Sequence, residues 1–468
     1  MPKIQVLNLG GLNQYTNPLI KGIGEVIHSV NVDSYPFGAK TKRGGYDTYL
    51  GTADGSAVNS LFHWQTNAGS TFVYRASGSA LYYSIEGTGA WTLAGNGTIS
   101  PGASVGYAVL NNTLIVGDGV GSTRHTTNGT AFTNTTLAPI SNTFAQYQNR
   151  IYAGGTASDL FYSTTNDATN WALSGTSDSS SLVIPGEGKI QKIFTANDRL
   201  IATKTSGLMY KWDGYSLIDT TTTLGPTSSK SVSSKEGLHI WLNRNGIYGY
   251  TGVLPQLISN AIQGQIYNRA GNGITANDFS IAPSTFYKNS YYLGIGNVTN
   301  DITKYTVNNC IVNYDLQKNS FDNYSYYNKP TAMHTFNLSG VETVIFGDSS
   351  GQCYKLNGTS TSDNGQPIES IIELCTATDD VGANKEFRRI KVFFNPGSTA
   401  KVQVSIANTF TKDNKNWVDI GDAKDGLYEL AFKANSRGRV LFLKVYENSI
   451  DQPFTFYGYS IEYSIVPD

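Results

Sequence analysis

The sequence predicts an all-β protein: a β-propeller of six to seven blades, preceded by an extended N-terminal arm and followed by a C-terminal β-sandwich. Aromatic residues reach 12%, with 30 tyrosines, while charged residues are only 15%, a composition that favours strands over helices. Short turns containing Asn, Asp or Gly recur every ~40 to 50 residues, the period of a four-stranded blade. Beyond a polar stretch at 357–367, the strands become longer and alternate apolar with polar residues.

Residues 1–57 are expected to form the N-terminal arm and the first strands. Glycine, proline and asparagine interrupt this segment at short intervals, and such residues mark turns. No enzyme motif has this layout. The punctuating positions are Gly10-Gly11, Asn17-Pro18, Gly24-Glu25, Asn31-Val32 and Lys42-Arg43 followed by Gly44-Gly45.

Residues 58–362 repeat a strand, a turn, a second strand and a closing strand with Tyr or Trp, and this repeat predicts the propeller. A two-residue turn precedes an apolar run such as TLIVG, RIYAGG, RLIAT, LHIWL or YYLGIG. Asn and Asp tolerate positive φ, so these turns suit tight hairpins. The turns are Asn111-Asn112, Gln148-Asn149, Asn197-Asp198, Glu236-Gly237, Lys288-Asn289 and Ser339-Gly340.

One repeat unit is too small to bury its own face, and packing blade on blade around an axis solves this problem. An ordinary β-sandwich, or a run of small sandwiches, is the alternative for this region. Regular strand spacing without intervening helical periodicity favours the propeller. The stretch 253–271 is the one expected short helix, an insertion between blades.

Residues 363–468 are predicted to form one antiparallel sandwich of about six strands. Turns at Asn395-Pro396-Gly397 and Asp425-Gly426 separate them. The expected strands are IESIIELC, FRRIKVFFNP, AKVQVSIANTF, YELAFKA, RVLFLKVYEN and FTFYGYSIEYSIV.

Charge and cysteine content narrow the classes of function. The formal net charge is −1, whereas a protein that grips DNA by neutralising phosphates should be visibly basic. Cys310, Cys353 and Cys375 are an odd number without CxxC spacing, which argues against a disulfide framework and a cysteine zinc site. The N-terminus lacks the apolar region of a signal peptide, and no stretch approaches ~18 apolar residues. We therefore expect assembly in the cytosol and no membrane span.

We expect no catalytic residue, no cofactor site and no metal site. The histidines show neither HxH nor HExxH spacing, so zinc chemistry has no support. A GxSxG elbow, a Walker loop and a GxGxxG stretch opening a helix are also missing, and GDGVGS at 117–122 falls in a hairpin. The histidines are His28, His63, His125, His239 and His334.

Two features of the sequence could indicate a glycosidase: a turn similar to one in sialidases, and paired carboxylates. YSTTNDATNW at 162–171 loosely resembles the Asp-box turn of sialidase propellers, a blade corner rather than a catalytic group. Glycoside cleavage needs two carboxylates roughly 5 to 10 Å apart. The acidic residues concerned, expected mostly in turns next to Gly or Asn, are Asp118, Asp167, Asp213, Asp315 and Asp348. The candidates for an arginine cluster at the axis are Arg75, Arg124, Arg150, Arg199 and Arg244.

The N-terminal features resemble the arm of tail nozzle proteins from short-tailed bacteriophages, also called packaged-DNA stabilisation or tail tubular B proteins. Those chains begin with a strand carrying Gly-Gly (here NLGGLN), then an Asn- or Gln-Pro step (TNPL) and a Gly-Glu pair (IGEV). An Asn at the next strand (SVNVD) and a basic residue before Pro or Gly (TKRGGY) follow; Gly45 stands where many members have Pro. The ending FTFYGYSIEYSI and the hairpin KDNKNWVDI before it resemble the family's C-terminal sandwich.

This resemblance implies a structural protein of the virion tail, not an enzyme. Members form a six-subunit tube below the portal and adaptor, retain packaged DNA against a plug or needle, and carry tail fibres or spikes. It thus implies a homohexamer, assembled in the host cytoplasm, through which DNA passes without sequence-specific binding. The arm 1–46 would reach along the ring or adaptor and add a strand to a neighbour's sheet edge. The alternative is a carbohydrate-binding or glycosidase propeller acting at a cell surface.

Overall fold

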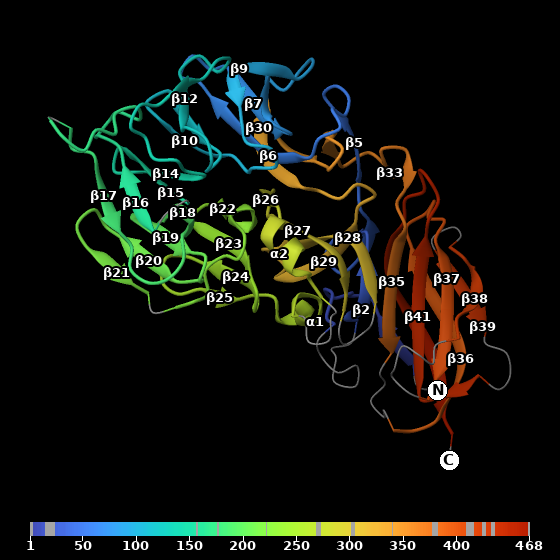
Figure 1. The fold of residues 1–468 in the computed structure, drawn as a ribbon. Coiled ribbons are helices and arrows are strands. Elements are labelled where there is room, and N and C mark those ends of the chain that lie inside the picture. The colour runs from blue at the N-terminus through green and yellow to red at the C-terminus, as the bar shows by residue number, and fades with distance from the viewer. Residues whose placement is uncertain are drawn as a thin grey trace.

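The computed structural model shows a ring of seven sheets beside a two-sheet sandwich (Figure 1). The protein is therefore all-β, a seven-bladed propeller joined to a β-sandwich. The first strand, β1, and the last strand, β42, both belong to the sandwich. The residues described are 3–14, 24–155, 158–175, 177–220, 222–267, 273–300, 305–338, 340–376, 382–408, 416–423, 427–431 and 436–466.

Blades 1 to 6 are antiparallel meanders of four consecutive strands. Blade 1 contains β6 (Val58–Gln65), β7 (Thr71–Ser77), β8 (Ala80–Ile85) and β9 (Thr92–Thr98). Blade 2 contains β10 (Gly106–Leu110), β11 (Thr113–Gly117), β12 (Arg124–Thr126) and β13 (Thr133–Asn134). Blade 3 contains β14 (Thr143–Tyr147), β15 (Arg150–Gly154), β16 (Asp159–Tyr162) and β17 (Ser180–Val183). Blade 4 contains β18 (Ile190–Ala196), β19 (Arg199–Lys204), β20 (Met209–Trp212) and β21 (Leu217–Asp219). Blade 5 contains β22 (Ser233–Lys235), β23 (Leu238–Asn243), β24 (Gly246–Tyr250) and β25 (Gln256–Leu257). Blade 6 contains β26 (Ser284–Tyr287), β27 (Ser290–Thr299), β28 (Thr306–Asp315) and β29 (Ser320–Ser325).

Blade 7 is built from two distant parts of the chain. Its first three strands are β30 (Ala332–Leu338), β31 (Val341–Gly347) and β32 (Cys353–Asn357). Its fourth strand is β5 (Gly45–Tyr49), which pairs antiparallel with β32. The short strands β33 (Ser362–Asp363) and β34 (Gln366–Pro367) extend the same sheet. The N-terminal segment therefore closes the ring.

The predicted hairpin turns are present between the first and second strands of the blades. Asn111 and Asn112 have φ of 47° and 59°, the left-handed region that such turns require. Positive φ also occurs at Gln148-Asn149, Asn197-Asp198, Glu236-Gly237, Lys288 and Gly340, whereas Ser339 lies outside the described residues.

Hydrogen bonds between neighbouring blades gather these turns at one end of the ring. The Asn67 N–H donates to Asn112 Oδ1 (2.7 Å), and the Tyr147 hydroxyl donates to the Asp198 carbonyl (2.8 Å). Between blades, rings stack, as the buried Phe62 does on the half-buried Tyr107 with centroids 4.7 Å apart. Apolar and aromatic packing between blades thus replaces a single central core.

Helical segments are short and lie between blades. The helix predicted within 253–271 is confirmed in part, as η2 (Asn260–Ile262) and α1 (Gln263–Ile266), but β25 occupies its start and 268–272 lie outside the described residues. The sequence did not predict η1 (Ser229–Ser231) or α2 (Ala276–Ile281), which begins where Thr275 caps the Asp278 N–H. Within the described residues, no helix is long and apolar enough to cross a membrane.

The sandwich contains the predicted C-terminal strands and four strands from the N-terminal segment. Sheet A contains β3 (Val32–Asp33), β4 (Lys40–Lys42), β42 (Thr455–Ile465), β36 (Lys385–Phe394) and β39 (Leu427–Ala431), with β1 (Lys3–Val6) on β42 and β40 (Arg437–Gly438) on β36. Sheet B contains β2 (Val26–Val30), β35 (Ser370–Thr376), β41 (Val440–Glu447), β37 (Lys401–Ala407) and β38 (Val418–Asp422). Their shared core includes Ile372, Ile390, Val404, Leu443 and Ile461.

The N-terminal segment is not the separate arm that the sequence predicted for residues 1–57. Its described strands pair within this chain: β1 and β4 with β42, β2 with β35, and β5 with β32. Pairing satisfies backbone groups that would otherwise be left at open sheet edges. The segment therefore belongs to both domains. The Asn17-Pro18 step and the Asp425-Gly426 turn lie outside the described residues.

Candidate functional site: the junction of the two domains

One continuous segment, 26–49, crosses from the sandwich to the propeller. It supplies β2, β3 and β4 to the sandwich and β5 to blade 7. Where it crosses, it passes the returning linker so closely that side chains cannot fit. A Cβ on Gly45 would lie 1.9 Å from the Ser362 carbonyl oxygen, and one on Gly44 would lie 2.8 Å from Gly358 Cα. The Gly44-Gly45 pair is therefore required by this close approach.

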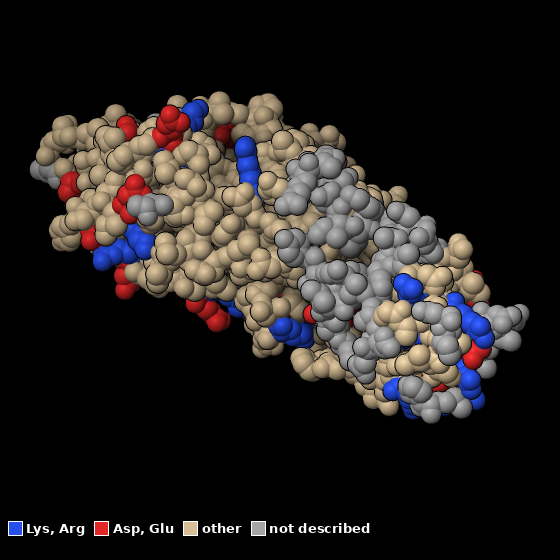
Figure 2. All heavy atoms as spheres, turned by 90° about the horizontal axis from the view of Figure 1, so that it is seen from below, with Lys and Arg blue, Asp and Glu red and all other residues tan. Residues whose placement is uncertain are grey.

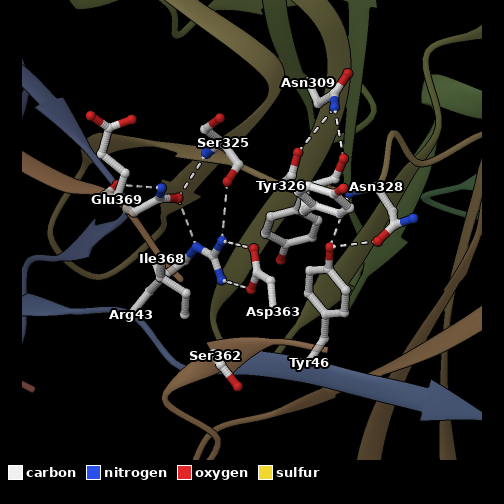
Figure 3. A network of polar contacts seen from close by, with 12 residues as sticks. Arg43, Tyr46, Asn309, Ser325, Tyr326, Asn328, Ser362, Asp363, Ile368 and Glu369 are labelled. Atoms are coloured by element: carbon white, nitrogen blue, oxygen red, sulfur yellow. Dashed lines mark hydrogen bonds and ion pairs between the residues drawn. The ribbon is translucent and has the colours of Figure 1, made fainter. Parts of the chain in front are cut away.

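Arg43 lies at the centre of the junction, 4% exposed, with all five of its N–H groups engaged (Figure 3). Nη1 and Nη2 donate to the two oxygens of Asp363, at 2.7 and 2.6 Å. Nη1 also donates to the Gly44 carbonyl (2.9 Å), and Nη2 to the Ser325 carbonyl (3.1 Å). Nε donates to Asn31 Oδ1 (2.8 Å). Bidentate pairing with complete donor satisfaction suits Arg, and Lys could not reproduce it.

Asn31 connects Arg43 to both domains. Its φ of 58° places it in the left-handed region between β2 and β3. Besides accepting from Arg43, Oδ1 accepts the Ser325 N–H (2.8 Å) of blade 6, and Nδ2 donates to the Glu369 carbonyl (2.7 Å) beside sheet B. Two sequence features of the resemblance, SVNVD and TKRGGY, therefore meet in a single hydrogen-bond network.

Aromatic rings enclose the propeller side of this network. The Arg43 guanidinium lies 4.7 Å from the Tyr326 ring centroid, a cation–π contact. Tyr46 is fully buried, and its hydroxyl donates to Asn328 Oδ1 (3.0 Å). Burial by itself would lower the pKa of Arg43, but the Asp363 charge outweighs it and raises the pKa above its ordinary value. Arg43 therefore stays protonated at any physiological pH.

Two further buried ion pairs hold the same segment. Lys40 Nζ contacts Asp322 Oδ1 of β29 at 2.6 Å, and the Ser34 hydroxyl donates to Asp322 Oδ2 (2.9 Å). Lys42 Nζ contacts Glu447 Oε2, at the end of β41, at 2.5 Å. Removing one partner of a buried pair costs about 3–5 kcal/mol because it strands the other charge. The junction therefore demands one relative position of propeller and sandwich.

Other features of the resemblance also lie in paired positions. The Gly10 N–H donates to the Gly24 carbonyl (2.9 Å), and Asn13 Nδ2 donates to Glu25 Oε2 (2.9 Å), so NLGGLN packs beside IGEV. FTFYGYSIEYSI contains β42, which pairs with β1, β4 and β36. TNPL, and residues 412–415 of the KDNKNWVDI hairpin, lie outside the described residues.

The residues considered for glycosidase chemistry occupy other roles. The five aspartates named above accept backbone N–H groups within their own turns, which confirms their predicted placement. Trp171 of the Asp-box-like stretch is buried at a blade corner and donates to the Ala168 carbonyl (2.9 Å). Three of the candidate arginines pair with aspartates instead of converging: Arg75 with Asp54, Arg150 with Asp178 and Arg199 with Asp213.

One histidine contact was not apparent from the sequence. His63 Nδ1 and His334 Nε2 lie 2.7 Å apart across the seam between blades 1 and 7. They are neighbours only because the ring closes, so their sequence spacing carries no signal. In the described part of the chain, no three His, Cys, Asp or Glu residues gather as a metal site. The three cysteines are free thiols.

Comparisons with known proteins assign no family to this chain. No family model matches the sequence, and no curated protein matches it either. The structure is similar to the computationally designed Ika8 protein (TM-score 0.40, 12% identity, 67% of this chain and 99% of that one). It is also similar to the Neurospora crassa Pan2 WD40 domain (0.40, 7%, 65% and 90%) and to a chain of the Mitotic Checkpoint Complex (0.43, 11%, 67% and 93%).

Proposed function

We propose that this protein is a structural component of a phage tail nozzle. Six copies form a tube below the portal and adaptor, retain the packaged DNA, conduct it during ejection and dock tail fibres or spikes. The observation that carries the proposal is the convergence at the domain junction of features that resemble that family. Asn31 precedes Arg43 by 12 residues, and the Gly44-Gly45 pair follows Arg43 directly, yet all of them are needed at the same crossing.

The mechanical character of the chain supports this role. A wall segment exposed to the pressure of packaged DNA must not hinge between its domains. Three buried ion pairs, at Lys40, Lys42 and Arg43, join one segment to both domains. Breaking one buried pair costs about 3–5 kcal/mol, so these pairs oppose separation of the two domains under load.

The surface charge supports the role as well. A conduit should not bind its polyanionic cargo, so a near-neutral surface suits it better than a basic one. On the face shown in Figure 2, most of the propeller surface is uncharged, and acidic and basic side chains are scattered over it. The whole chain has 34 basic and 35 acidic residues.

Negative-stain imaging of the purified chain tests the proposal. We expect six-fold rings with a central hole. A monodisperse monomer that binds or hydrolyses glycans on an array would overturn the nozzle role and favour the cell-surface propeller. Deleting residues 1–30 is a poor test of assembly, because it removes β1 and β2 from the chain's own sandwich.

A sharper assembly variant lies on the β3–β4 hairpin, the part of the N-terminal segment that points away from the core. Tyr35 and Phe37 are 70% and 79% exposed there. In the proposed tube, this hairpin contacts a neighbouring subunit or the adaptor. Replacing both by Ser should leave the monomer's unfolding midpoint unchanged and weaken ring formation. Rings of undiminished stability would exclude the hairpin from the contact.

A further inference from the structure

The propeller encloses a central cavity of about 750 Å³ that all seven blades line with residues of their first strands. Its wall is rich in hydroxyl groups that pair with one another across neighbouring blades. Ser233 Oγ lies 2.8 Å from Ser284 Oγ, and Thr285 Oγ1 lies 2.7 Å from Thr335 Oγ1. These hydroxyls join the blades and already have partners. A ligand must therefore be sought at the groups that lack them.

Two lysine ammonium groups on the wall lack a counter-charge. Lys192 of β18 is half-buried, and no described residue forms a hydrogen bond or ion pair with its Nζ. Lys230 of η1 is also half-buried, and its Nζ has one neutral partner, the Thr331 carbonyl at 3.2 Å. Burial alone lowers the pKa of Lys192, and it lowers that of Lys230 to about 8. Neither pKa is raised by a nearby carboxylate.

Among the described residues that line the cavity, Glu342 is the single carboxylate, and it is engaged near the hairpin turns, at the end of the inner strands away from Lys192. Glu342 follows the turn at Gly340, and its Oε2 accepts the Lys288 N–H (2.8 Å) within the ring of turns. Lys235, the third lysine on the wall, donates to the Lys288 carbonyl at that same end. Lys192 lies five residues before the Asn197 turn, toward the opposite end of the inner strands. Glu342 is thus placed to neutralise Lys235 rather than Lys192 or Lys230.

The wall also contains a buried ring nitrogen without a hydrogen-bond partner, Nε2 of His239. His239 is 4% exposed; its Nδ1 lies 2.6 Å from the Ser234 hydroxyl, while its Nε2 has no partner. Its ring packs on Phe194, with centroids 4.7 Å apart. Phe194 follows Lys192 by two residues, so their side chains share one face of β18. The unpaired Nε2 and the unpaired ammonium group therefore belong to one wall of the cavity.

We propose that this cavity is a binding site for a small oxyanion, a phosphate or a carboxylate, held by Lys192 and Lys230. An uncompensated cation in a desolvated place is unfavourable, and an anion that accepts charge-assisted hydrogen bonds removes that penalty. The cavity's remaining volume accommodates the body of a small organic acid or phosphate ester. This site does not depend on the proposed function in the tail.

Titration calorimetry with inorganic phosphate and with citrate, at constant ionic strength, tests the site and separates phosphate from carboxylate. We expect saturable binding of at least one of them. The double variant Lys192→Met, Lys230→Met should weaken it at least tenfold, because each lysine supplies a charge-assisted hydrogen bond. The matched control is Lys211→Met in the same blade, whose ammonium already has two carbonyl partners, Gly252 and Val253. Unchanged affinity in the double variant, or no binding of either anion, overturns the proposal.

Lysine acetylation of the unmodified protein gives a second measurement that does not require a variant to fold. Mass spectrometry would follow the labelling rates of Lys192 and Lys230 with and without the anion. Bound anion should slow both rates several-fold and leave that of Lys211 unchanged. Equal rates with and without the anion would place the anion elsewhere.

Discussion

Blades 1 to 6 and the region formed by blade 7 with the sandwich are assembled from the chain in opposite ways. In blades 1 to 6, each strand pairs with the next strand in sequence, as β10 does with β11 across the Asn111-Asn112 turn. Blade 7 and the sandwich also contain local hairpins, but they are completed by pairs that join distant residues, such as Tyr49 with Cys353 and Lys3 with Glu462. Because one segment, 26–49, serves both, closing the ring and completing the sandwich are coupled. The lesson is that the N-terminal segment determines how the domains sit together.

Removing residues 1–49 should have the largest effect on this coupling. It takes one strand from blade 7 and four from the sandwich, so both domains keep open edges and lose buried contacts. We expect loss of the cooperative thermal transition, since the missing contacts exceed the ~5–15 kcal/mol that stabilises a typical domain. Calorimetry and near-UV circular dichroism would record it.

Adding a peptide of residues 2–50 in trans provides the control for that truncation. The peptide should restore part of the transition, because the strand partners in β32, β35 and β42 remain in the truncated chain. A truncated chain that melts at the original temperature without the peptide would contradict the coupling.

The sequence predicted the strand pairs between neighbours in the chain and missed the pairs between distant segments, and the reason is physical. The preference of Asn and Gly for positive φ is a property of a few neighbouring residues, so the blade turns could be found. The strand β5 pairs with a partner about 300 residues away, and strand propensity does not predict which strand that partner is. The ring closure and the sandwich's N-terminal strands therefore emerged only from the structure.

The candidate site shows the same contrast between features that lie close together in the sequence and partners that lie far away. The sequence singled out Asn31, the basic pair Lys42-Arg43 and the Gly44-Gly45 pair as features of a resemblance, but not as contacts of one another. Their acidic partners, Glu447 and Asp363, lie far along the chain and carry no local sign of the pairing. One signal was available: several basic residues close together, in a chain with only 15% charged residues, are expected to have specific partners when they occupy a strand.

Arg43→Met should weaken the junction without removing any strand. It leaves the Asp363 carboxylate buried without its partner, and we expect the free energy of unfolding to fall by about 3–5 kcal/mol. Urea unfolding would measure it. Trp417 is the sandwich tryptophan and the other five lie in the propeller, so their fluorescence separates the two regions. Splitting of one transition into two would show that the domains unfold independently once the pair is broken.

Arg150→Met is the matched control for that variant. The Arg150–Asp178 pair lies within blade 3, with Asp178 half exposed, and its geometry is as short as that at the junction (2.5 Å). Exposed pairs contribute less than about 1 kcal/mol. Equal losses in the two variants would mean that burial at the junction adds nothing.

Acid should destabilise the propeller through its histidines. Burial lowers the pKa of His63, that of His239 to about 4 and that of His334 to about 3, from an ordinary value of 6.5. Between these folded-state values and 6.5, the unfolded chain binds more protons than the folded one, so stability falls as the pH drops through this window. Urea midpoints at pH 7 and pH 5 would measure the slope, and His334→Gln should flatten it. A slope unchanged by that variant would assign the acid sensitivity to other groups.

The smallest effect is expected from the turns that end the local hairpins. Asn112 has φ of 59°, and its Oδ1 accepts the Asn67 N–H from the neighbouring blade. Asn112→Ala imposes the left-handed penalty and removes the acceptor, a loss of about 1–2 kcal/mol. Asn112→Gly removes the same acceptor without the penalty, so it should lose less than the alanine variant. Urea unfolding of the pair separates the two contributions. Equal losses would show that the bond between blades, not the backbone conformation, is what this Asn supplies to the ring.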